Sequence, residues 1–397
     1  MDPVRNPYAP GAGQRPPELA GRDSELGAFE VMLERVARSR PERSVVLIGL
    51  RGVGKTVLLN AMRSAAVRRG WGTGKLEARP GQSLRRPLAA ALHLAVRELG
   101  HPQDADVRQV LGVVKSFAQR EPDGAKPSKQ RWSPGIDVPA AIGRADSGDT
   151  EIDLVELFTD VAGLAADTGR GIAIFIDEMQ DLGPDDVSAL CAACHEISQQ
   201  GMPLVVVGAG LPHVPAVLSA AKSYSERLFR YARIDRLERV AADTALQVPA
   251  RDEGAAFADD ALAAMYEATG GYPYFVQAYG KVAWDVAPRS PITADDVAVA
   301  APAAESELAV GFFGSRYERA TPAEREYLRA MADVAVPATP DEPVATAAVA
   351  DALDRSPQSV SPARDALLKK GLIYSGQRGR IAFTVPHFGR YLRELEA

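Results

Sequence analysis

The stretch that decides the fold is SVVLIGLRGVGKT, residues 44–56. Its beginning is apolar and rich in β-branched residues, which predicts a short buried strand. A helix is predicted to follow from Lys55, so the segment GLRGVGKT connects a strand to a helix N-terminus. Gly49, Gly52 and Gly54 carry no side chain that would crowd the backbone. The backbone N–H groups can therefore surround a chain of phosphates.

The other residues of this segment supply the chemistry for a nucleotide and its metal ion. Lys55 is expected to reach the β- and γ-phosphates, and Thr56 to offer its hydroxyl to Mg²⁺. The helix that follows points its positive end at the anion. We therefore predict that ATP and Mg²⁺ bind here. The residues expected to contact the nucleotide are Gly49, Leu50, Arg51, Gly52, Val53, Gly54, Lys55, Thr56 and Val57.

A second motif, IAIFIDEMQ, covers residues 172–180 and ends a predicted buried strand with two acids. Side chains at this end of a parallel strand meet the crevice at the carboxyl edge of the sheet. Asp177 is expected to hold Mg²⁺ through water, and Glu178 to orient and deprotonate the attacking water. Glu178 and Lys55 are thus the predicted catalytic residues. The alternative is a strand that ends in two solvated acids.

Strands and helices alternate through the first part of the chain, which predicts a three-layer α/β fold with a parallel sheet. Further strands are predicted near residues 71–79, 203–208 and 231–235, and helices over residues 19–36, 86–99, 151–168 and 184–200. The chain is too long for one ordinary core. Its predicted parts are a disordered tail (1–17), a nucleotide-binding domain (18–238, with an insertion at about 119–150), a helical lid (239–317) and a winged helix-turn-helix (318–397).

Three apolar residues followed by Asp-Glu, after a phosphate-binding loop, resemble the ASCE division of P-loop ATPases, which includes the AAA+ proteins. LAGRDSEL (19–26) is similar to the box that opens STAND ATPases and their archaeal relatives, including ATPases of the origin-recognition type. GGYPYF (270–275) is similar to a motif of their helical lid, and VVVGAGLP (205–212) resembles the sensor strand of members with a C-terminal winged helix. The resemblance covers residues 19–397.

This resemblance implies roles for four more residues. Gly21 and Arg22 would lie near the adenine, while Tyr272 and Pro273 would close the lid over the nucleotide. AAA+ hydrolases usually carry a polar sensor after the fourth strand and a sensor arginine in the lid. Here residues 208–210 read Gly-Ala-Gly and the lid motif has no arginine. We therefore expect slow hydrolysis, which a turnover of about 1–100 s⁻¹, as in kinases, would contradict. The candidate arginines for the γ-phosphate, in cis or from a neighbouring subunit, are Arg227, Arg230 and Arg233.

The last part of the chain predicts a winged helix. Helices are expected near residues 321–333 and 344–353, and a third over 361–370, with Ser361 as its cap and Pro362 in its first turn. LIYSGQRGRIAFTV (372–385) then predicts a hairpin that turns at residues 377–379.

The same region is basic. Residues 355–393 hold eight basic residues and one acid, in a chain of net charge -6. A DNA-binding winged helix would use such a segment, although winged helices also serve as protein-interaction or packing modules. The residues predicted to contact DNA are Ser359, Arg364, Lys369, Lys370, Arg378 and Arg380.

The composition, 46% hydrophobic and 25% charged, is typical of a soluble globular protein. The first 18 residues lack the apolar core of a secretory signal, and the chain holds no run of 18 apolar residues that would span a membrane. Two cysteines make no disulfide framework. These features predict a cytoplasmic protein without a membrane partner.

The leading interpretation is a molecular switch that binds ATP, hydrolyses it slowly, and presents its winged helix to double-stranded DNA in replication, transposition or regulation. The alternative that the resemblance leaves open is a STAND-type signalling or defence ATPase, in which the winged helix is a protein-interaction or autoinhibitory module. The expected partners are ATP or ADP and, in the leading interpretation, DNA. Self-association on ATP binding is a further expectation.

Overall fold

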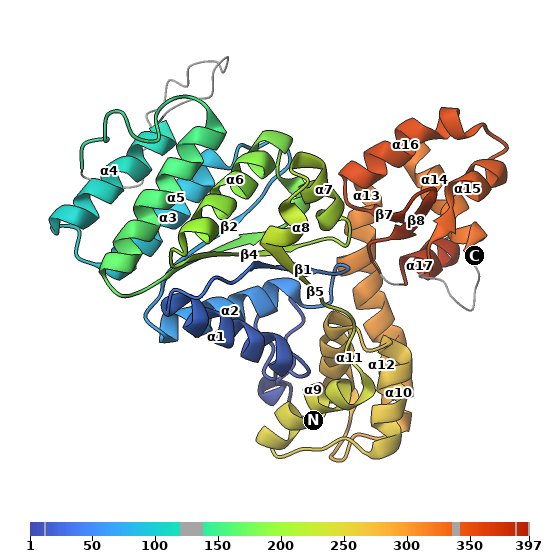
Figure 1. Ribbon diagram of the computed structural model, residues 1–397. Coiled ribbons are helices and arrows are strands. Elements are labelled where there is room, and N and C mark those ends of the chain that lie inside the picture. Colours follow the sequence, from blue (N-terminus) through green and yellow to red (C-terminus); the bar gives the residue numbers. More distant parts are fainter. Residues whose placement is uncertain (12, 120–137, 336–341, 386, 396–397) are drawn as a thin grey trace. The chain divides into compact units, whose positions relative to one another are not determined.

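The structure is a computed structural model that describes residues 1–11, 13–119, 138–335, 342–385 and 387–395 (Figure 1). Most of the predicted insertion, residues 120–137, lies outside the described residues. The chain forms two compact units. The first, here called the sheet unit, contains Asp23–Ile48 and Leu58–Arg233. The second, here called the loop–lid unit, contains Met1–Arg22, Gly49–Val57 and Ile234–Ala397.

The sheet unit is built on five parallel strands in the order β2-β3-β4-β1-β5. This confirms the predicted α/β class and its parallel sheet. Because all five strands run the same way, their carboxyl ends share one edge, where Asp177 and Gly210 end β3 and β4. The strands are β1 (Ser44–Ile48), β2 (Gly72–Glu77), β3 (Ile172–Asp177), β4 (Leu204–Gly210) and β5 (Phe229–Arg233).

Helices cover both faces of this sheet (Figure 1). Side chains alternate between the two faces along each strand. Ile174 and Val206 join the core formed with α3, α5 and α6, whereas Phe175 points to the other face and packs edge-on against Phe29 of α1, with ring centroids 6.2 Å apart. The helices are α1 (Asp23–Ala37), α2 (Lys55–Arg68), α3 (Arg85–Leu99), α4 (Ala105–Gln119), α5 (Thr150–Asp167), α6 (Pro184–Gln200), α7 (Val214–Ala221) and α8 (Ser225–Leu228).

A buried ion pair and a cation–π contact connect three of these helices. Arg85 of α3 lies 2.8 Å from the carboxylate of Asp153 in α5, and the two side chains are 3% and 0% exposed. Asp153 also accepts hydrogen bonds from the backbone N–H and the hydroxyl of Ser147, at 2.8 and 2.7 Å. The Arg85 guanidinium lies over the ring of Phe117 in α4, 4.5 Å from its centroid. Helix α4 itself falls in a stretch for which the sequence predicted no element.

In the loop–lid unit, helices occupy the region predicted as a lid. They are α9 (Arg239–Asp252), α10 (Asp259–Thr269), α11 (Pro273–Val286), α12 (Ala294–Leu308), the π-helical turn η3 (Ala309–Gly314) and α13 (Ser315–Glu318). Within the described residues, one helical stretch, Ala294–Tyr317, is long and apolar enough to cross a membrane by length and composition alone. Val297, Ala300, Ala304 and Leu308 form its buried face, as expected of a lid helix that packs against α10 and α11.

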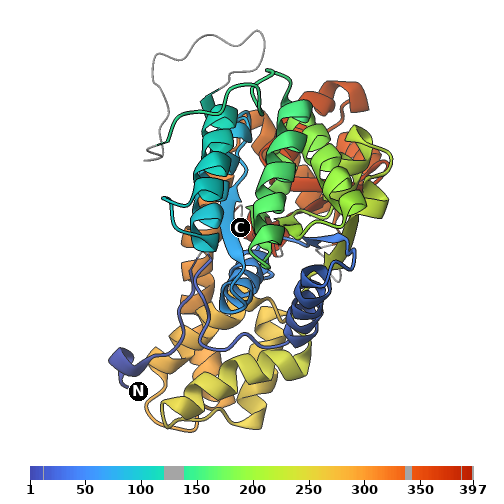
Figure 2. The same ribbon diagram turned by 60° about the vertical axis from the view of Figure 1, so that its left-hand side comes forward.

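The described part of the N-terminal tail, predicted to be disordered over residues 1–17, lies against the lid (Figure 2). Its short 3-10 helix η1 covers Pro3–Arg5. Tyr8 is 4% exposed, and its hydroxyl donates a hydrogen bond to the carbonyl of Leu246 at 2.6 Å. The buried ring of Tyr8 and its hydrogen bond attach this part of the tail to the lid, and contacts of this kind can order a chain terminus. Disorder of the tail as a whole stays a prediction.

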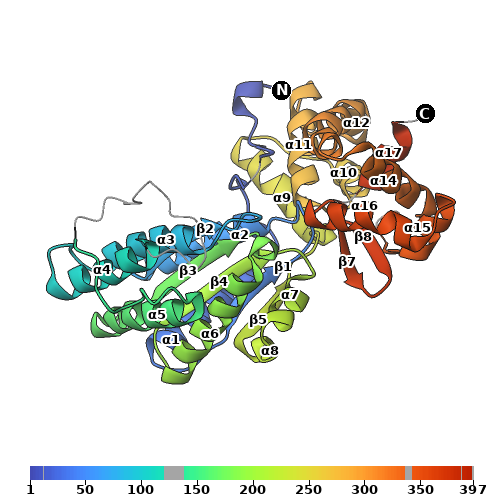
Figure 3. The same cartoon turned by 90° about the horizontal axis from the view of Figure 1, so that it is seen from above.

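The C-terminal module, here defined as α14 through α17, is a small α/β arrangement (Figure 3). Its sheet has the order β6-β8-β7, and both pairs are antiparallel. The hairpin turns between Gln377 and Arg380, as predicted. The elements are α14 (Pro322–Val334), β6 (Val344–Ala345), α15 (Thr346–Ala352), α16 (Pro357–Lys369), β7 (Ile373–Gln377), β8 (Arg380–Phe383) and α17 (Phe388–Glu394).

Helix α16 begins four residues before the predicted start at residue 361. Ser356 caps it by accepting the N–H of Ser359, and Pro357 occupies the first turn. Ser-Pro occurs twice, and the predicted start lay at the second pair instead of the first. Pro362 is accommodated inside the helix because the Ser361 hydroxyl donates to the carbonyl of Gln358 at 2.9 Å. That carbonyl would otherwise lose its partner, since proline has no N–H.

Candidate nucleotide site

The loop that follows β1 has a backbone that only glycine adopts readily. Gly52 and Gly54 have φ values of 86° and 91°. A Cβ on Gly49 would lie 2.1 Å from the carbonyl oxygen of Ile234, so only glycine allows this close approach. A Cβ on Gly54 would meet no atom within 4 Å, so space is open beside the loop at that point. This geometry fits the predicted binding of a phosphate chain.

Lys55 lies across the loop. Its ammonium donates hydrogen bonds to the carbonyl oxygens of Gly49 and Leu50, at 2.9 and 2.7 Å. The oxygens of a bound phosphate chain would compete with these two carbonyl oxygens for the Lys55 ammonium, which is the predicted partner of the β- and γ-phosphates. The N-terminal segment passes beside Thr56, since a Cβ on Gly13 would lie 3.1 Å from the Thr56 methyl group.

Arg22 supports the loop from its other side. It is 8% exposed and donates to the carbonyl oxygens of Val53 and Asp235, at 3.2 and 2.5 Å. Gly21 has a φ of 68°, and a Cβ there would lie 2.7 Å from the Cβ of Ala241. Both residues therefore lie where the loop, the start of the chain and the lid meet. Their contact with adenine stays a prediction.

The lid touches the loop through residues that the sequence analysis did not select. The backbone N–H of Tyr274 lies 3.4 Å from the carbonyl oxygen of Gly52. A Cβ on Gly52 would lie 3.5 Å from the ring of Phe312, which stacks on Tyr274 with centroids 4.6 Å apart. Tyr272 is 5% exposed and its ring packs near Phe275. Pro273 begins α11. The expected closure of the lid by Tyr272 and Pro273 stays a prediction.

The C-terminal module also touches the loop. The backbone N–H of Arg51 donates to the carbonyl oxygen of Thr384, which follows β8, at 3.0 Å. A Cβ on Gly371 would lie 2.9 Å from Nη2 of Arg51, so the guanidinium is close to the turn that precedes β7. The Thr384 hydroxyl donates to the carbonyl of Gly371 at 2.7 Å, which joins these two contact points.

The two predicted acids lie at the carboxyl edge of the parallel sheet. Asp177 is the last residue of β3, is 7% exposed, and accepts the N–H of Glu178 at 3.0 Å. Glu178 has a φ of 53°, in the left-handed region that non-glycine residues seldom adopt. Gln180, which the sequence analysis did not select, donates through Nε2 to the carboxylate of Glu178 at 2.5 Å.

The candidate arginines lie at different edges of the sheet. Arg227 precedes β5, and Arg230 pairs with Val45 near the start of β1. Arg233 pairs with Ile48 at the carboxyl end of that strand. Arg230 and Arg233 are therefore separated by roughly 10 Å of strand. A contact of any of the three arginines with the γ-phosphate, in cis or from a neighbouring subunit, stays a prediction.

Many of the basic residues counted in the C-terminal module have acidic or carbonyl partners. Residues 355–393 contain one acidic residue, and most of the acids that pair with this segment lie outside it. Of the six predicted DNA contacts, Ser359, Lys369, Arg378 and Arg380 are exposed, and neither Lys369 nor Arg378 has an ion pair within the described ranges. The paired cations are Arg355 (with Glu326), Arg364 (with Asp365), Lys370 (with Glu324) and Arg390 (with Glu305 and Glu394), while Arg380 donates to the carbonyl of Pro343.

Lys370 is expected to stabilise the module, and its contact with DNA stays a prediction. Its ammonium lies 2.6 Å from the carboxylate of Glu324, which is 5% exposed. Burial would raise the pKa of Glu324, but hydrogen bonds from Lys370 and Thr321 outweigh it and hold the pKa below its ordinary value of 4.5. Lys370→Ala should therefore lower the free energy of unfolding at pH 7 by about 1–3 kcal/mol, as measured by denaturant titration.

This loss has a predictable pH dependence. A lowered carboxyl pKa contributes stability above pH 4.5 that disappears as the pH falls through the folded-state value. The difference between wild type and Lys370→Ala should therefore shrink below pH 4.5. Lys369→Ala, a change of the exposed neighbour, is the matched control and should cost less than about 0.5 kcal/mol. Equal stability of wild type and Lys370→Ala at pH 7 would exclude the structural role.

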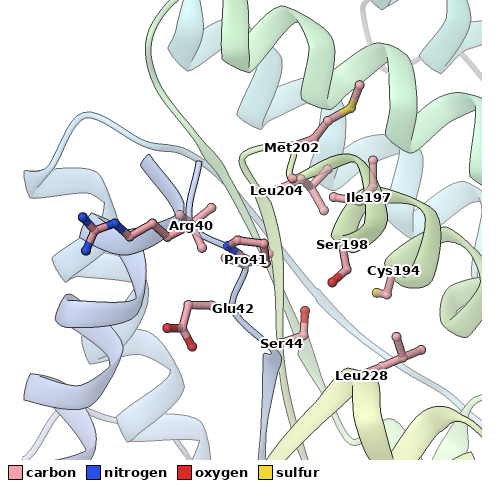
Figure 4. Close-up of a pocket in the computed structure, with 13 residues that line it drawn as sticks. Arg40, Pro41, Glu42, Ser44, Cys194, Ile197, Ser198, Met202, Leu204 and Leu228 are labelled. Carbon is pink, nitrogen blue, oxygen red and sulfur yellow. The ribbon is translucent and has the colours of Figure 1, made fainter. Parts of the chain in front are cut away.

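A hollow at the opposite edge of the sheet does not belong to the nucleotide site (Figure 4). Ser44 and Leu204, at the starts of β1 and β4, line it together with Cys194. Burial raises the pKa of Cys194 far above its usual range and that of Cys191 to about 11. Both thiols are thus protonated and unreactive near neutral pH. No group of three or more His, Cys, Asp or Glu side chains suited to a metal ion occurs in the described part of the chain.

Comparisons with known proteins agree with this geometry. Residues 18–207 match the family described as AAA ATPase domain, and residues 310–392 match a domain of unknown function, DUF8462. No curated protein matches the chain.

Several solved structures align with most of this chain, and one of them, with a TM-score above 0.5, shows a similar fold. The Walker-type ATPase of Pyrococcus abyssi aligns with a TM-score of 0.59 and 16% identity, over 96% of this chain and 97% of that chain. The Orc1 protein of Aeropyrum pernix, solved in complex with DNA, aligns with a TM-score of 0.45 and 15% identity, over 96% and 94%. The RuvB Holliday junction branch migration motor of Thermotoga maritima aligns with a TM-score of 0.46 and 16% identity, over 96% and 99%.

The glycine loop that follows β1, the acids that end β3 and the parallel sheet are the features expected of the matched family. Residues 18–207 therefore match the AAA ATPase domain family both in sequence and in these structural features.

Proposed function

We propose that this protein is an ATP-operated switch, in which the nucleotide at the phosphate-binding loop controls how the C-terminal module is held. One observation carries the proposal: the Arg51 N–H, within the loop, donates to the Thr384 carbonyl of the module at 3.0 Å. An N–H group has one proton to donate. A loop that rearranges around phosphates would therefore weaken this bond, and the module would be released or reoriented.

The motifs support separate roles for four residues in binding and hydrolysing ATP. Lys55 binds the β- and γ-phosphates, while Thr56 and Asp177 hold Mg²⁺. Glu178 orients the water and accepts its proton as the water oxygen attacks the γ-phosphorus. The bond from that phosphorus to the β–γ bridging oxygen breaks, which yields ADP and inorganic phosphate. The chain lacks a polar side chain at residues 208–210, and slow hydrolysis remains our expectation.

The contacts of the C-terminal module favour an internal regulatory role. The order of its elements, α14-β6-α15-α16-β7-β8, supports a winged helix. Arg51 contacts it at Thr384 and lies near Gly371, so the module serves as an autoinhibitory or protein-interaction element, as in STAND-type ATPases. We further propose that ATP binding promotes self-association, and that the protein acts in the cytoplasm without a membrane partner.

A distance measurement within the loop–lid unit tests the switch. Spin labels on Val240→Cys in α9 and Ser359→Cys in α16 report the separation of lid and module, because both positions are exposed. The native cysteines, Cys191 and Cys194, are buried. In a Glu178→Gln background that retains ATP, adding ATP and Mg²⁺ should shift the distance distribution, and Lys55→Ala should abolish the shift. An unchanged distribution in the presence of bound ATP would refute the switch.

DNA binding is the second candidate output. Lys369 at the end of α16 and Arg378 in the hairpin turn are exposed cations of the kind that contact phosphates. If duplex DNA binds, replacing either by alanine should weaken binding and reduce the salt dependence by about one phosphate contact. Arg108→Ala, an exposed arginine of α4, is the control. Wild type and Lys55→Ala are each titrated with DNA in the presence of ATP, in the presence of ADP and without nucleotide. These titrations show whether the nucleotide controls DNA binding. Absence of salt-dependent binding in all states would exclude this output.

A further inference from the structure

We propose that Gln180 positions the carboxylate of Glu178 for ATP hydrolysis. This inference rests on the function proposed above. It concerns the 3-10 turn η2 (Met179–Asp181), which follows β3 and lies within the sheet unit. Gln180 is called a positioning residue because it acts through Glu178 and is not assigned a contact with the reacting atoms.

The side-chain amide of Gln180 bridges two strand ends. Its Nε2 lies 2.5 Å from Oε2 of Glu178, just beyond β3. Its Oε1 accepts the backbone N–H of Leu211, just beyond β4, at 3.1 Å. Only the amide nitrogen can donate to a carboxylate and only the amide oxygen can accept an N–H, so the two partners together fix the orientation of the amide.

Two glycines at the end of β4 make room for this arrangement. A Cβ on Gly208 would lie 1.9 Å from the sulfur of Met179, so η2 can fold over β4 only above a glycine. A Cβ on Gly210 would lie 2.9 Å from Oε1 of Gln180. The end of β4, which reads Gly208, Ala209 and Gly210, therefore offers no polar side chain of its own. Gln180, in the turn η2 that follows the neighbouring strand β3, supplies an amide beside Glu178.

The backbone of Glu178 explains why such a partner is needed. Its φ of 53° lies in the left-handed region, which is disfavoured for a residue with a Cβ. Strained residues persist only where surrounding contacts hold them, and they concentrate at active sites. The hydrogen bond from Gln180 holds one carboxylate oxygen and so restricts how the carboxylate can turn. A general base must keep such a defined position to reach its water.

The first test separates hydrolysis from binding. Gln180→Ala should lower kcat by about 10- to 100-fold, the usual effect of losing a group that orients a catalytic ligand. ATP affinity and thermal stability should stay close to those of wild type, because Gln180 is not one of the predicted nucleotide contacts. Gly210→Ala is an independent variant that leaves the glutamine in place but crowds its Oε1, and it should also lower kcat. A lowered affinity with an unchanged kcat would overturn the proposal.

The second test uses a residue of the same length. Gln180→Glu keeps an acceptor for Leu211 but replaces the donor with a second carboxylate beside Glu178. At neutral pH it should lose at least as much activity as Gln180→Ala. Two adjacent carboxylates share a proton more readily as the pH falls. The activity of Gln180→Glu relative to Gln180→Ala should therefore recover toward pH 5. If the ratio of the Gln180→Glu activity to the Gln180→Ala activity stays constant between neutral pH and pH 5, the proposed hydrogen bond is contradicted.

A double-mutant cycle decides whether Gln180 acts through Glu178. In a Glu178→Gln background, Gln180→Ala should change the single-turnover rate by less than about twofold, since coupled groups are not additive. A further loss of 10-fold or more would show that the two residues act independently. If Lys55→Ala and Glu178→Gln fail to lower hydrolysis, the proposed function is wrong. If they lower it and Gln180→Ala does not, only the present inference is wrong.

Discussion

Replacing Glu178 with glutamine is expected to lower the rate of ATP hydrolysis by about 100- to 10,000-fold while ATP binding is retained. Glutamine keeps the length of the side chain and an oxygen that can accept the hydrogen bond from Gln180. It cannot take a proton from water, so the step that needs a base is lost. The single-turnover rate of phosphate release measures the effect, and calorimetry with ATP and Mg²⁺ measures the retained affinity.

Two controls make this result specific. Asp185→Asn removes an acid in the first turn of α6, a few residues beyond the motif, and should leave hydrolysis unchanged. Lys55→Ala should lose ATP affinity itself, because the ammonium is the predicted partner of the phosphates. A Glu178→Gln enzyme that hydrolyses ATP within about threefold of the wild-type rate would remove Glu178 from the reaction and point to another base.

The sequence was sufficient to predict the centre of the sheet because β1, β3 and β4 are nearly pure apolar runs. Ile172–Asp177 is buried at every position, and β4 likewise, as strands covered on both faces must be. In the sheet, β4 lies between β3 and β1 and pairs in parallel with both. The glycines of the phosphate-binding loop were also predictable from the sequence, because Gly52 and Gly54 have the positive φ values that such a loop requires.

The sequence was not sufficient where partners lie far apart along the chain. Counting charges within residues 355–393 gave a strongly basic segment, but Arg355 pairs with Glu326 and Arg390 with Glu305. A count restricted to residues 355–393 does not include Glu326 or Glu305. Likewise, Tyr274 and Phe312 approach Gly52 from two separate lid helices, and no local pattern marks them.

The absence of a polar side chain at the end of β4 shows a different limit. From the sequence, Gly208, Ala209 and Gly210 indicated only that a side chain was missing. In the structure, the missing side chains leave the space that Met179 and Gln180 occupy. The physical reason for the glycines is therefore steric, and only the fold of η2 over β4 reveals it.

Breaking the ion pair between Arg85 and Asp153 is expected to destabilise the sheet unit by about 3–5 kcal/mol. Arg85→Ala would leave the Asp153 carboxylate, which is 0% exposed, without its cation. Hydrogen bonds from Ser147 would remain, but the contact of the guanidinium with Phe117 would be lost as well. Hydrogen exchange of β3 in denaturant measures the effect, because buried core strands exchange through global opening. Arg144→Ala breaks exposed ion pairs and should cost less than about 1 kcal/mol.

The pH dependence distinguishes a buried charge pair from packing alone. Burial by itself would raise the pKa of Asp153, but hydrogen bonds from Ser147 and Arg85 outweigh it and lower the pKa below its ordinary value of 3.8. The pair therefore stabilises the fold above pH 3.8, and this contribution is lost as the pH falls through the folded-state value. The difference between wild type and Arg85→Ala should accordingly be largest near neutral pH and shrink in acid. In the double variant Arg85→Ala with Asp153→Ala, the loss should be clearly less than the sum of the single losses. Additive losses with no pH dependence would mean that the two side chains stabilise the unit only by filling space.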